Sequence, residues 1–296
     1  VDAFFVSTSA TCVTGLTPFD TWSHWNPFGQ GVILCLIQIG GLGLASITTG
    51  FSVLLRKKMG LRELWLASES ANGSSLDVRR LLGIILRFTL VCEGIGAAIL
   101  MIRLVPEYGL FGIWASIFTS VSAFCNAGFD IFGIKTPDMS LIPYAEDPLI
   151  SLTVAFLIIV GGIGFVVVSD IYYNQLRPRI LRQQTRKLSF HSQVCLIFTG
   201  ILLISGTIIL FCSEFGSTMK DMNFFSRLNV SFFQSVSART AGFASVNIAD
   251  EHDFSKIITI MLMFIGACPG STGGGIKVTT LVVLICTVFS VFRGYE

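Results

Sequence analysis

Three glycines recur in segments of similar sequence and define the chemistry that this chain offers. Gly15, Gly128 and Gly242 lie 113 and 114 residues apart, counted from 15 to 128 and from 128 to 242. The side chains just before them differ, which favours a shared role for the main chain. Glycine tolerates positive φ and close backbone approach, so neighbouring carbonyl groups can be turned toward one point. Carbonyl oxygens gathered in this way replace the water shell of a dehydrated cation.

We therefore predict an ion-binding filter made of three loops. The candidate residues are Val13, Thr14, Gly15, Asn126, Ala127, Gly128, Thr240, Ala241 and Gly242. A single glycine of this kind is more often a helix C-cap, but three in register favour the filter. Residues 13–15, 126–128 and 240–242 are called the first, second and third filter loops below.

A second glycine-rich stretch, residues 266–277, interrupts the last apolar segment. Six of its twelve residues are Pro or Gly, which break helices. Non-helical backbone at membrane depth is tolerated where it is buried in protein or lines a wet cavity. We predict that this stretch, called the gate stretch, lies against the ion path. Its candidate site residues are Gly270, Ser271, Thr272, Gly273, Gly274, Gly275 and Lys277.

Lys277 has two interpretations. Its ammonium group either opposes cation passage until the gate stretch moves, or it reaches water or pairs with a carboxylate such as Glu93 or Asp170. The stretch is not a phosphate-binding loop, because Ile276 separates Gly275 from Lys277 and no Gly-Lys-Ser/Thr sequence is present.

Other charged residues fall in or beside apolar segments. Arg87, Glu93 and Arg103 lie in one such segment, where charge is costly in lipid, so we expect them to face protein and to pair across helices. Arg239 lies beside the third filter loop. It is either an electrostatic tuner of the filter or a structural ion-pair partner, and the second interpretation is favoured.

Composition places much of the chain in lipid. Of the 296 residues, 52% are hydrophobic and 13% are charged, and the mean hydropathy is +0.76. This is more apolar surface than a soluble domain of this size can bury. The net charge of +2 gives no indication of a nucleic-acid partner. The 8 cysteines and 3 histidines show no metal-ligand or catalytic spacing, so we predict neither an enzyme nor a cofactor bound by this chain.

The apolar segments fall into two length classes. A helix that spans a bilayer needs about 20 apolar residues. Residues 31–55, 81–105, 149–169, 194–212 and 257–292 are long enough, and the last is interrupted by the gate stretch. Shorter segments at 3–16, 111–129 and 228–243 each end near a filter glycine. We predict that the shorter segments are re-entrant pore helices.

Basic residues set the orientation. Lys and Arg concentrate at 56–80 and 177–187, and short loops rich in these residues stay in the cytoplasm. The acidic segments beside the pore helices then lie outside, so the filter loops enter from the outer face. The partly negative C-terminal ends of the pore helices point toward the membrane centre in this orientation, which favours a cation there.

These elements repeat. A glycine motif follows each filter loop in register: Gly-Gly-x-Gly at 40–43 and at 161–164, and Gly266 at the start of the gate stretch. We interpret the first two motifs as sites of close helix packing. The predicted fold class is an all-α membrane protein with repeated helix–pore-loop–helix units around a pseudo-fourfold central pore. The predicted repeats are residues 1–55, which lack an outer helix, 56–175, and 176–296, which contain the gate.

The motifs resemble the Trk/Ktr/HKT superfamily of K⁺ transporters, and most of all its bacterial Ktr and Trk membrane subunits. The resemblance rests on the loops at 11–16, 125–129 and 239–243 and on the run at 270–277. It implies a K⁺ uptake pore, with K⁺ bound and dehydrated at the filter residues and an intramembrane gate below them. The family has four repeats, so we expect that the first outer helix and the fourth repeat lie outside these residues.

The resemblance also implies partners and a location. It implies a homodimer in the lipid bilayer, a multi-pass protein of a bacterial inner membrane. A cytosolic ring of RCK-type nucleotide-binding domains is expected beneath it, and nucleotide is expected only on this regulatory partner. The basic segments at 56–80 and 177–187 are candidate docking surfaces for the ring.

Two other function classes fit the sequence less well. An ion-coupled secondary transporter, with Na⁺ or another cation as its main substrate, also uses broken helices, but three glycine loops from one face disfavour inverted repeats. A membrane enzyme or sensor is disfavoured because no catalytic or metal-binding cluster is present in the sequence.

Overall fold

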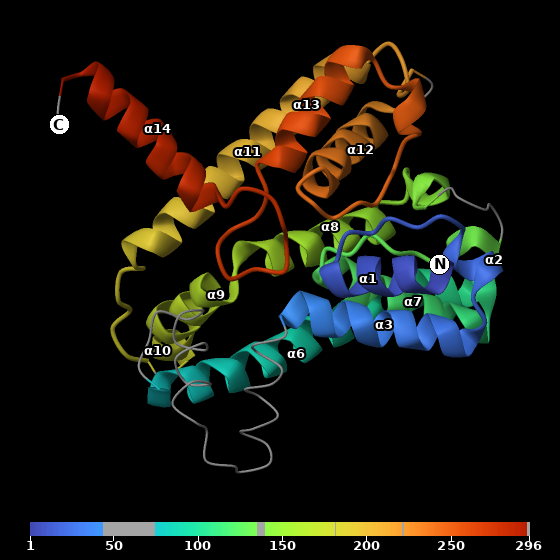
Figure 1. Ribbon diagram of the computed structural model, residues 1–296, viewed down its shortest axis with the longest axis horizontal. Helices are drawn as coiled ribbons and strands as arrows, with labels where there is room; N and C mark the ends of the chain where they lie inside the picture. Colours follow the sequence, from blue (N-terminus) through green and yellow to red (C-terminus); the bar gives the residue numbers. More distant parts are fainter. Residues whose placement is uncertain (44–74, 135–139, 181, 221, 295–296) are drawn as a thin grey trace.

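The described part of the chain is helical. The computed structural model in Figure 1 describes residues 1–43, 75–134, 140–180, 182–220 and 222–294, and the side chains of 75–82 are not described. Within these ranges, the one strand-like feature is an isolated bridge between Ile265 and Ile276. The predicted all-α class is confirmed. The pseudo-fourfold arrangement stays a prediction.

Three short helices precede the filter loops, as the sequence predicts. They are α1 (Asp2–Cys12), α7 (Leu110–Phe124) and α12 (Phe224–Ser237). At 11, 15 and 14 residues they are too short to span a bilayer. Helix α7 is the most deeply buried, with Phe118 and Phe124 fully enclosed. Pore helices sheltered in this way fix the positions of the loops that follow them.

Two inner helices start with the same local signals. Helix α3 (Pro27–Leu42) is capped by Asn26, and helix α8 (Pro148–Ile163) by Asp147. Each cap side chain accepts a backbone N–H, and each helix has Pro at its first position, where no N–H is needed. Helix α3 ends at Leu42. Residues 44–55 of the predicted first span and residues 56–74 of the first basic segment lie outside the described residues.

The predicted continuous span at 149–169 is wrong. Helix α8 ends at Ile163, and the chain turns by 93° into α9 (Phe165–Ile171), η3 (Tyr172–Leu176) and α10 (Arg177–Ile180). The break lies at Gly164, whose φ of 95° is outside the helical range. Instead of continuing the helix, the Phe165 N–H donates to the carbonyl of Gly270 in the gate stretch, at 2.8 Å.

Two long helices flank the inner ones. Helices α6 (Ser75–Tyr108) and α11 (Phe190–Glu214) are long and apolar enough to cross a membrane, and the bent α8–α9 pair makes a third candidate span. Ile197, Ile201, Ile204 and Ile208 are exposed along one side of α11 at helical spacing. Because exposed isoleucines in such a row are costly in water, this face is suited to lipid.

The third repeat ends in two helices that the gate stretch separates. Helix α13 (Asp253–Phe264) runs beside α11 and α12, and α14 (Val278–Phe292) projects away from the rest of the molecule (Figure 1). The gate stretch loops down between them toward α8 and α9. Short segments complete the outer connections: α2 (Thr21–His24), η1 (Phe132–Ile134), η2 (Ile142–Tyr144) and η4 (Ile248–Asp250).

Arg87, Glu93 and Arg103 of α6, which the sequence predicts to face protein, have three different environments. Arg103 forms an ion pair with Asp147 at 2.6 Å, as expected for a charge that pairs across helices. Glu93 is buried, with 6% of its surface exposed. Arg87 is exposed, so the expectation that it faces protein is wrong in the described structure.

Candidate ion filter and gate

The three filter loops follow the same backbone path. The residue two before each glycine and the glycine itself both have positive φ, at Val13, Asn126 and Thr240 (56°, 55° and 70°) and at Gly15, Gly128 and Gly242 (74°, 70° and 85°). Positive φ is unusual for a β-branched residue such as Val13 or Thr240. Three repeats that share this rare alternation have a common local structure even though their side chains differ.

Hydrogen bonds within each loop leave carbonyl groups unused. The amide of the residue before the glycine donates back to the pore helix, in the pairs Thr14 to Ser9 (2.9 Å), Ala127 to Ser122 (2.8 Å) and Ala241 to Ser237 (3.0 Å). The loop amides are therefore turned toward their own helix. Among the described residues the carbonyls of the same peptides accept no backbone hydrogen bond, so they can face another group, as a filter requires.

Where two neighbouring filter loops meet, the glycine of one loop lies against a main-chain carbonyl of the next. A methyl group added to Gly15 would overlap the carbonyl oxygen of Ala127, and one added to Gly128 would contact that of Ala241. The first loop therefore abuts the second, and the second abuts the third. This contact explains, independently of φ, why glycine is needed at these positions.

The three glycines line one opening. A cavity of about 180 Å³ is bounded by Gly15, Gly128 and Gly242, together with Asp20 and Asp130. The Asp20 carboxylate accepts the N–H of Ser23 at 2.8 Å, which holds it at the rim. In the sequence these two acids indicated only the orientation of the chain. The structure adds that they lie at the mouth of the candidate filter.

A larger cavity connects the filter to the gate stretch. Its volume is about 620 Å³, and its lining includes Val13, Thr14 and Thr240 from the loops and Thr272 and Gly273 from the gate stretch. The structure thus places the predicted gate residues directly beside the predicted filter residues.

The gate stretch is docked on the second repeat. The amides of Cys268 and Thr272 donate to the carbonyls of Gly162 (3.0 Å) and Gly161 (3.2 Å). A methyl group on Gly161 would overlap the carbonyl oxygen of Phe124 at the end of α7, and Gly40 has the same relation to Thr11 in the first repeat. Close packing, which the sequence predicts for both motifs, is found, and the second motif also binds the gate.

Side chains add three more attachments. The Thr272 hydroxyl donates to the Phe124 carbonyl at 3.0 Å, and the Gly274 amide donates to the Thr240 hydroxyl at 3.1 Å. The Lys277 ammonium donates to the carbonyl of Gly273 at 2.6 Å. Of the two interpretations of Lys277, pairing with Glu93 or Asp170 is not what the described residues show. The lysine instead holds its own stretch.

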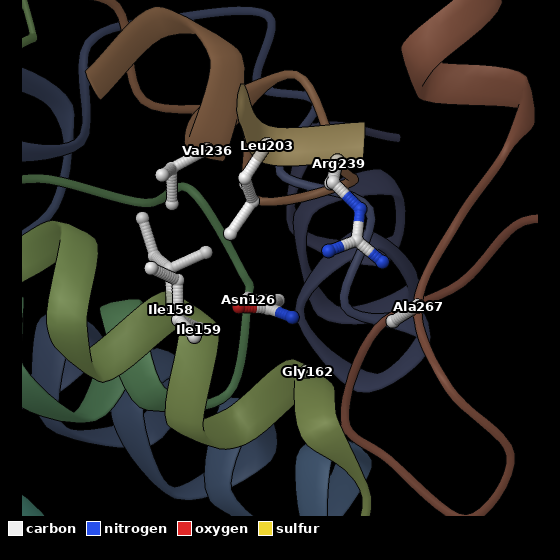
Figure 2. A pocket seen from close by; sticks show the side chains of 8 residues that line it. All are labelled: Asn126, Ile158, Ile159, Gly162, Leu203, Val236, Arg239 and Ala267. Atoms are coloured by element: carbon white, nitrogen blue, oxygen red, sulfur yellow. The ribbon is translucent and has the colours of Figure 1, made fainter. Parts of the chain in front are cut away.

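Arg239 connects the third loop with the base of the gate stretch. Its side chain is 7% exposed and donates to the Gly266 carbonyl at 3.0 Å, while its Nε has no partner among the described residues. Figure 2 shows the guanidinium between Asn126 and Ala267, beside a cavity of about 10 Å³. The favoured expectation was an ion pair, and the observed partner is a main-chain carbonyl.

Two serines were missed in the sequence. The hydroxyls of Ser122 and Ser237 donate to the carbonyls of Phe129 and Phe243, the residues just after the filter glycines. They close the second and third loops in the same way. A serine at the end of each of these pore helices was the available signal.

The chain is similar in sequence to known cation transport proteins. The family model described as "TrkH: Cation transport protein" matches residues 1–295. The chain is 40% identical over 99% of its length to the "Potassium/sodium uptake protein NtpJ" of Enterococcus hirae, and 39% identical over 99% to the "Ktr system potassium uptake protein B" of Bacillus subtilis. It spans 63% and 64% of the lengths of these two relatives.

A solved structure shares the fold. The structure described as the potassium transporter TrkH from Vibrio parahaemolyticus superposes with a TM-score of 0.69, at 19% identity, over 100% of this chain and 57% of that one. At 19% identity this match supports the fold alone. The helical membrane fold, the matched loops and the family model lead to one conclusion: the chain belongs to the TrkH family of cation transport proteins.

Proposed function

We propose that this chain forms the ion path of a K⁺ uptake transporter, in which filter carbonyls replace the water of a permeating ion. The observation that carries the proposal is the shared opening of Gly15, Gly128 and Gly242, reached by three loops of equal backbone conformation. The free carbonyls of the loops supply neutral oxygen ligands without a competing fixed charge. The names of the relatives, which mention potassium uptake, support the same substrate.

The test is K⁺ uptake by the complete protein in a bacterial strain that lacks its own K⁺ uptake systems. Growth and rubidium-tracer uptake at low K⁺ are expected with the wild-type protein and not with an empty vector. If the protein reaches the membrane but takes up neither K⁺ nor the rubidium tracer, the proposal is contradicted.

The second candidate is a cation transporter with Na⁺ as a main substrate. One relative is named a potassium/sodium uptake protein, which favours keeping this candidate. Only one glycine per loop is shared, so the selectivity is expected to be looser than in filters with longer glycine-containing loops. Gly15→Ser is expected to lower the preference for K⁺ over Na⁺, and competition of Na⁺ with tracer uptake measures it. An unchanged preference counts against the filter assignment.

The gate proposal rests on the docking of the gate stretch. Residues 270–277 lie beside the inner cavity and are held by hydrogen bonds from two repeats, so a change in these bonds repositions backbone at the ion path. The Lys277 ammonium adds positive charge to the same stretch. We propose that the gate stretch, in the position in which these hydrogen bonds hold it, limits the flux of the ion.

The proposed assembly is a homodimer in the bacterial inner membrane on a cytosolic RCK-type ring. Two relatives are named "Ktr system potassium uptake protein B". A name that assigns one protein to a system supports the existence of partner components. Nucleotide is expected on the ring and not on this chain. Charge reversal at the basic residues of 177–187 is expected to weaken co-purification of the ring. Retention of the ring by that variant argues against this docking surface.

A further inference from the structure

A buried carboxyl group lies behind the second filter loop. Glu93, in the middle of α6, is 6% exposed and sits where α6 meets α7 and α3. Its Oε1 is 4.0 Å from the Sγ of Cys125, and its side chain is hydrogen-bonded to Gln38 of α3. The hydroxyl of Ser120 donates to its main-chain carbonyl at 2.7 Å. Cys125 is followed directly by Asn126, so the carboxyl group is one residue away from the filter loop.

No cation of the described residues pairs with Glu93. Arg87, on the same helix, is exposed, and Arg103 is paired with Asp147. Arg239 directs its guanidinium to the Gly266 carbonyl, and Lys277 directs its ammonium to the Gly273 carbonyl, so both act on the gate stretch. The described neighbours of Glu93 are neutral: a thiol, an amide and a hydroxyl.

The location makes a negative charge doubly unfavourable without a counter-ion. An unpaired carboxylate inside a membrane protein is costly, and such residues are found where ions pass. Cys125 caps the C-terminal end of α7, which carries the partly negative end of the helix dipole. A carboxylate beside a helix C-terminus makes the local electrostatic potential more negative than either group alone. A cation in the adjacent filter loop is the available partner for both.

We propose that the Glu93 carboxyl group supplies, when a cation occupies the second filter loop, a negative charge that strengthens K⁺ binding there. This inference rests on the proposed function, because it takes K⁺ in the filter as given. Glu93 touches no carbonyl of the filter and acts through space and through Cys125. It is an affinity-determining residue outside the ring of ligands.

Charge and hydrogen bonding can be separated with two neutral variants. Glu93→Gln keeps the shape and a polar group for Gln38, whereas Glu93→Met keeps only the approximate volume. If the charge matters, both variants weaken K⁺ binding by the same factor, about tenfold for a charge roughly 10 Å from the ion at an effective dielectric constant of about 20. If only the hydrogen bond matters, Glu93→Gln behaves like wild type and Glu93→Met does not.

The experiment is a K⁺ titration of thermal stability on the complete protein in lipid nanodiscs, with choline replacing K⁺. Each variant gives a melting temperature without K⁺ and a K⁺ concentration for half-maximal stabilisation. Glu107→Gln is the matched control, because Glu107 is an exposed glutamate near the outer end of the same helix, bonded to Tyr144 at 2.9 Å. The control is expected to leave the K⁺ midpoint unchanged.

The outcomes are distinct. Both neutral Glu93 variants are expected to melt no earlier than wild type without K⁺, since a buried carboxyl group without a counter-ion has been removed, and to need about ten times more K⁺. An unchanged midpoint in Glu93→Gln overturns the inference, whether or not stability falls. If wild type itself is not stabilised by K⁺, the proposed function fails instead, and the two failures cannot be confused.

Discussion

The second and third filter loops share a backbone path and differ in what lies behind them. The residue directly before the second loop is Cys125, which packs against α3 and Glu93. The residue directly before the third loop is Arg239, which donates to the carbonyl of Gly266 in the gate stretch. One loop is therefore backed by fixed helices and a carboxyl group, and the other by the gate. We therefore expect changes behind the second loop to alter mainly ion affinity, and changes behind the third loop to alter mainly flux.

The largest expected effect removes what the two loops have in common. Gly128→Ala places a methyl group against the Ala241 carbonyl at a residue with φ of 70°. Since this combines strain with overlap, we expect uptake to fall by about two orders of magnitude. Tracer uptake normalised to membrane-inserted protein measures the loss.

Gly200→Ala is the control for this substitution. Gly200 lies in α11, and within the described part of the chain no atom beyond its sequence neighbours and its own helix backbone lies within 4 Å of a methyl group added there. This variant should transport like wild type. Equal uptake by both variants would mean that the contact between the second and third loops is unimportant.

Arg239 offers the sharpest contrast with Glu93. Arg239→Met removes the bond to Gly266 and a buried positive charge beside the path, and both changes favour cation flux. We expect the maximal uptake rate to rise about threefold to tenfold and the K⁺ concentration for half-maximal uptake to fall, because a nearby positive charge is lost. A shift in that concentration instead of the rate would break the proposed division between the two loops.

Thr272 tests the gate from the side of the second repeat. Thr272→Val keeps the shape but loses the hydrogen bond to the Phe124 carbonyl, which frees the stretch at one point. A bond of this kind contributes about 1 kcal/mol, so we expect the maximal rate to rise by about fivefold or less. Thr272→Ser retains the hydroxyl and should behave like wild type. A Ser variant as fast as the Val variant would argue against the bond.

The smallest expected effect concerns pH at the outer side of the third pore helix. Glu251 is buried, and its Oε1 accepts the side-chain amide of Gln234 in α12 at 3.1 Å. Burial, with a smaller contribution from the nearby Glu214, raises the pKa of Glu251 to about 7 from an ordinary value of 4.5. A raised folded-state pKa adds stability below pH 4.5 that is lost as pH rises through 7.

Melting temperatures between pH 5 and 8 check this prediction. Wild type is expected to lose about 2 °C more than Glu251→Gln over this range, because the glutamine does not ionise. Parallel curves for the two proteins would show that Glu251 does not titrate there. The K⁺ midpoint is expected to be unaffected, since Glu251 lines neither of the two cavities beside the filter loops.

Much of the fold follows from local sequence signals. The lengths of the three pore helices, their glycine loops and the interruption at 266–277 are all read from hydrophobic patterns and from Gly and Pro. The capping residues Asn26 and Asp147 also mark the starts of α3 and α8. These features are local, so a single sequence is sufficient to predict them.

Features that depend on contacts between repeats were not predictable in this way. The run at 149–169 has no charged residue, and its Gly-Gly-x-Gly motif at 161–164 also suits close packing within a continuous helix, so the sequence alone does not show that the helix breaks at Gly164. The break is stabilised by Gly270, which lies more than a hundred residues later in the chain. The partners of Arg239 and Lys277 were missed for a similar reason, since both are main-chain carbonyls, which every residue carries and no pattern distinguishes.

The bend at Gly164 has a consequence for biosynthesis. The carbonyls of Gly161 and Gly162 that receive the gate stretch belong to a helix that leaves the ribosome long before residue 268 is made. The end of α8 that carries these carbonyls is therefore made first, and the gate stretch folds against it later, as it enters the membrane. Damage to the earlier helix should therefore appear as a misplaced gate in otherwise inserted protein, even though the altered codon lies far upstream of it.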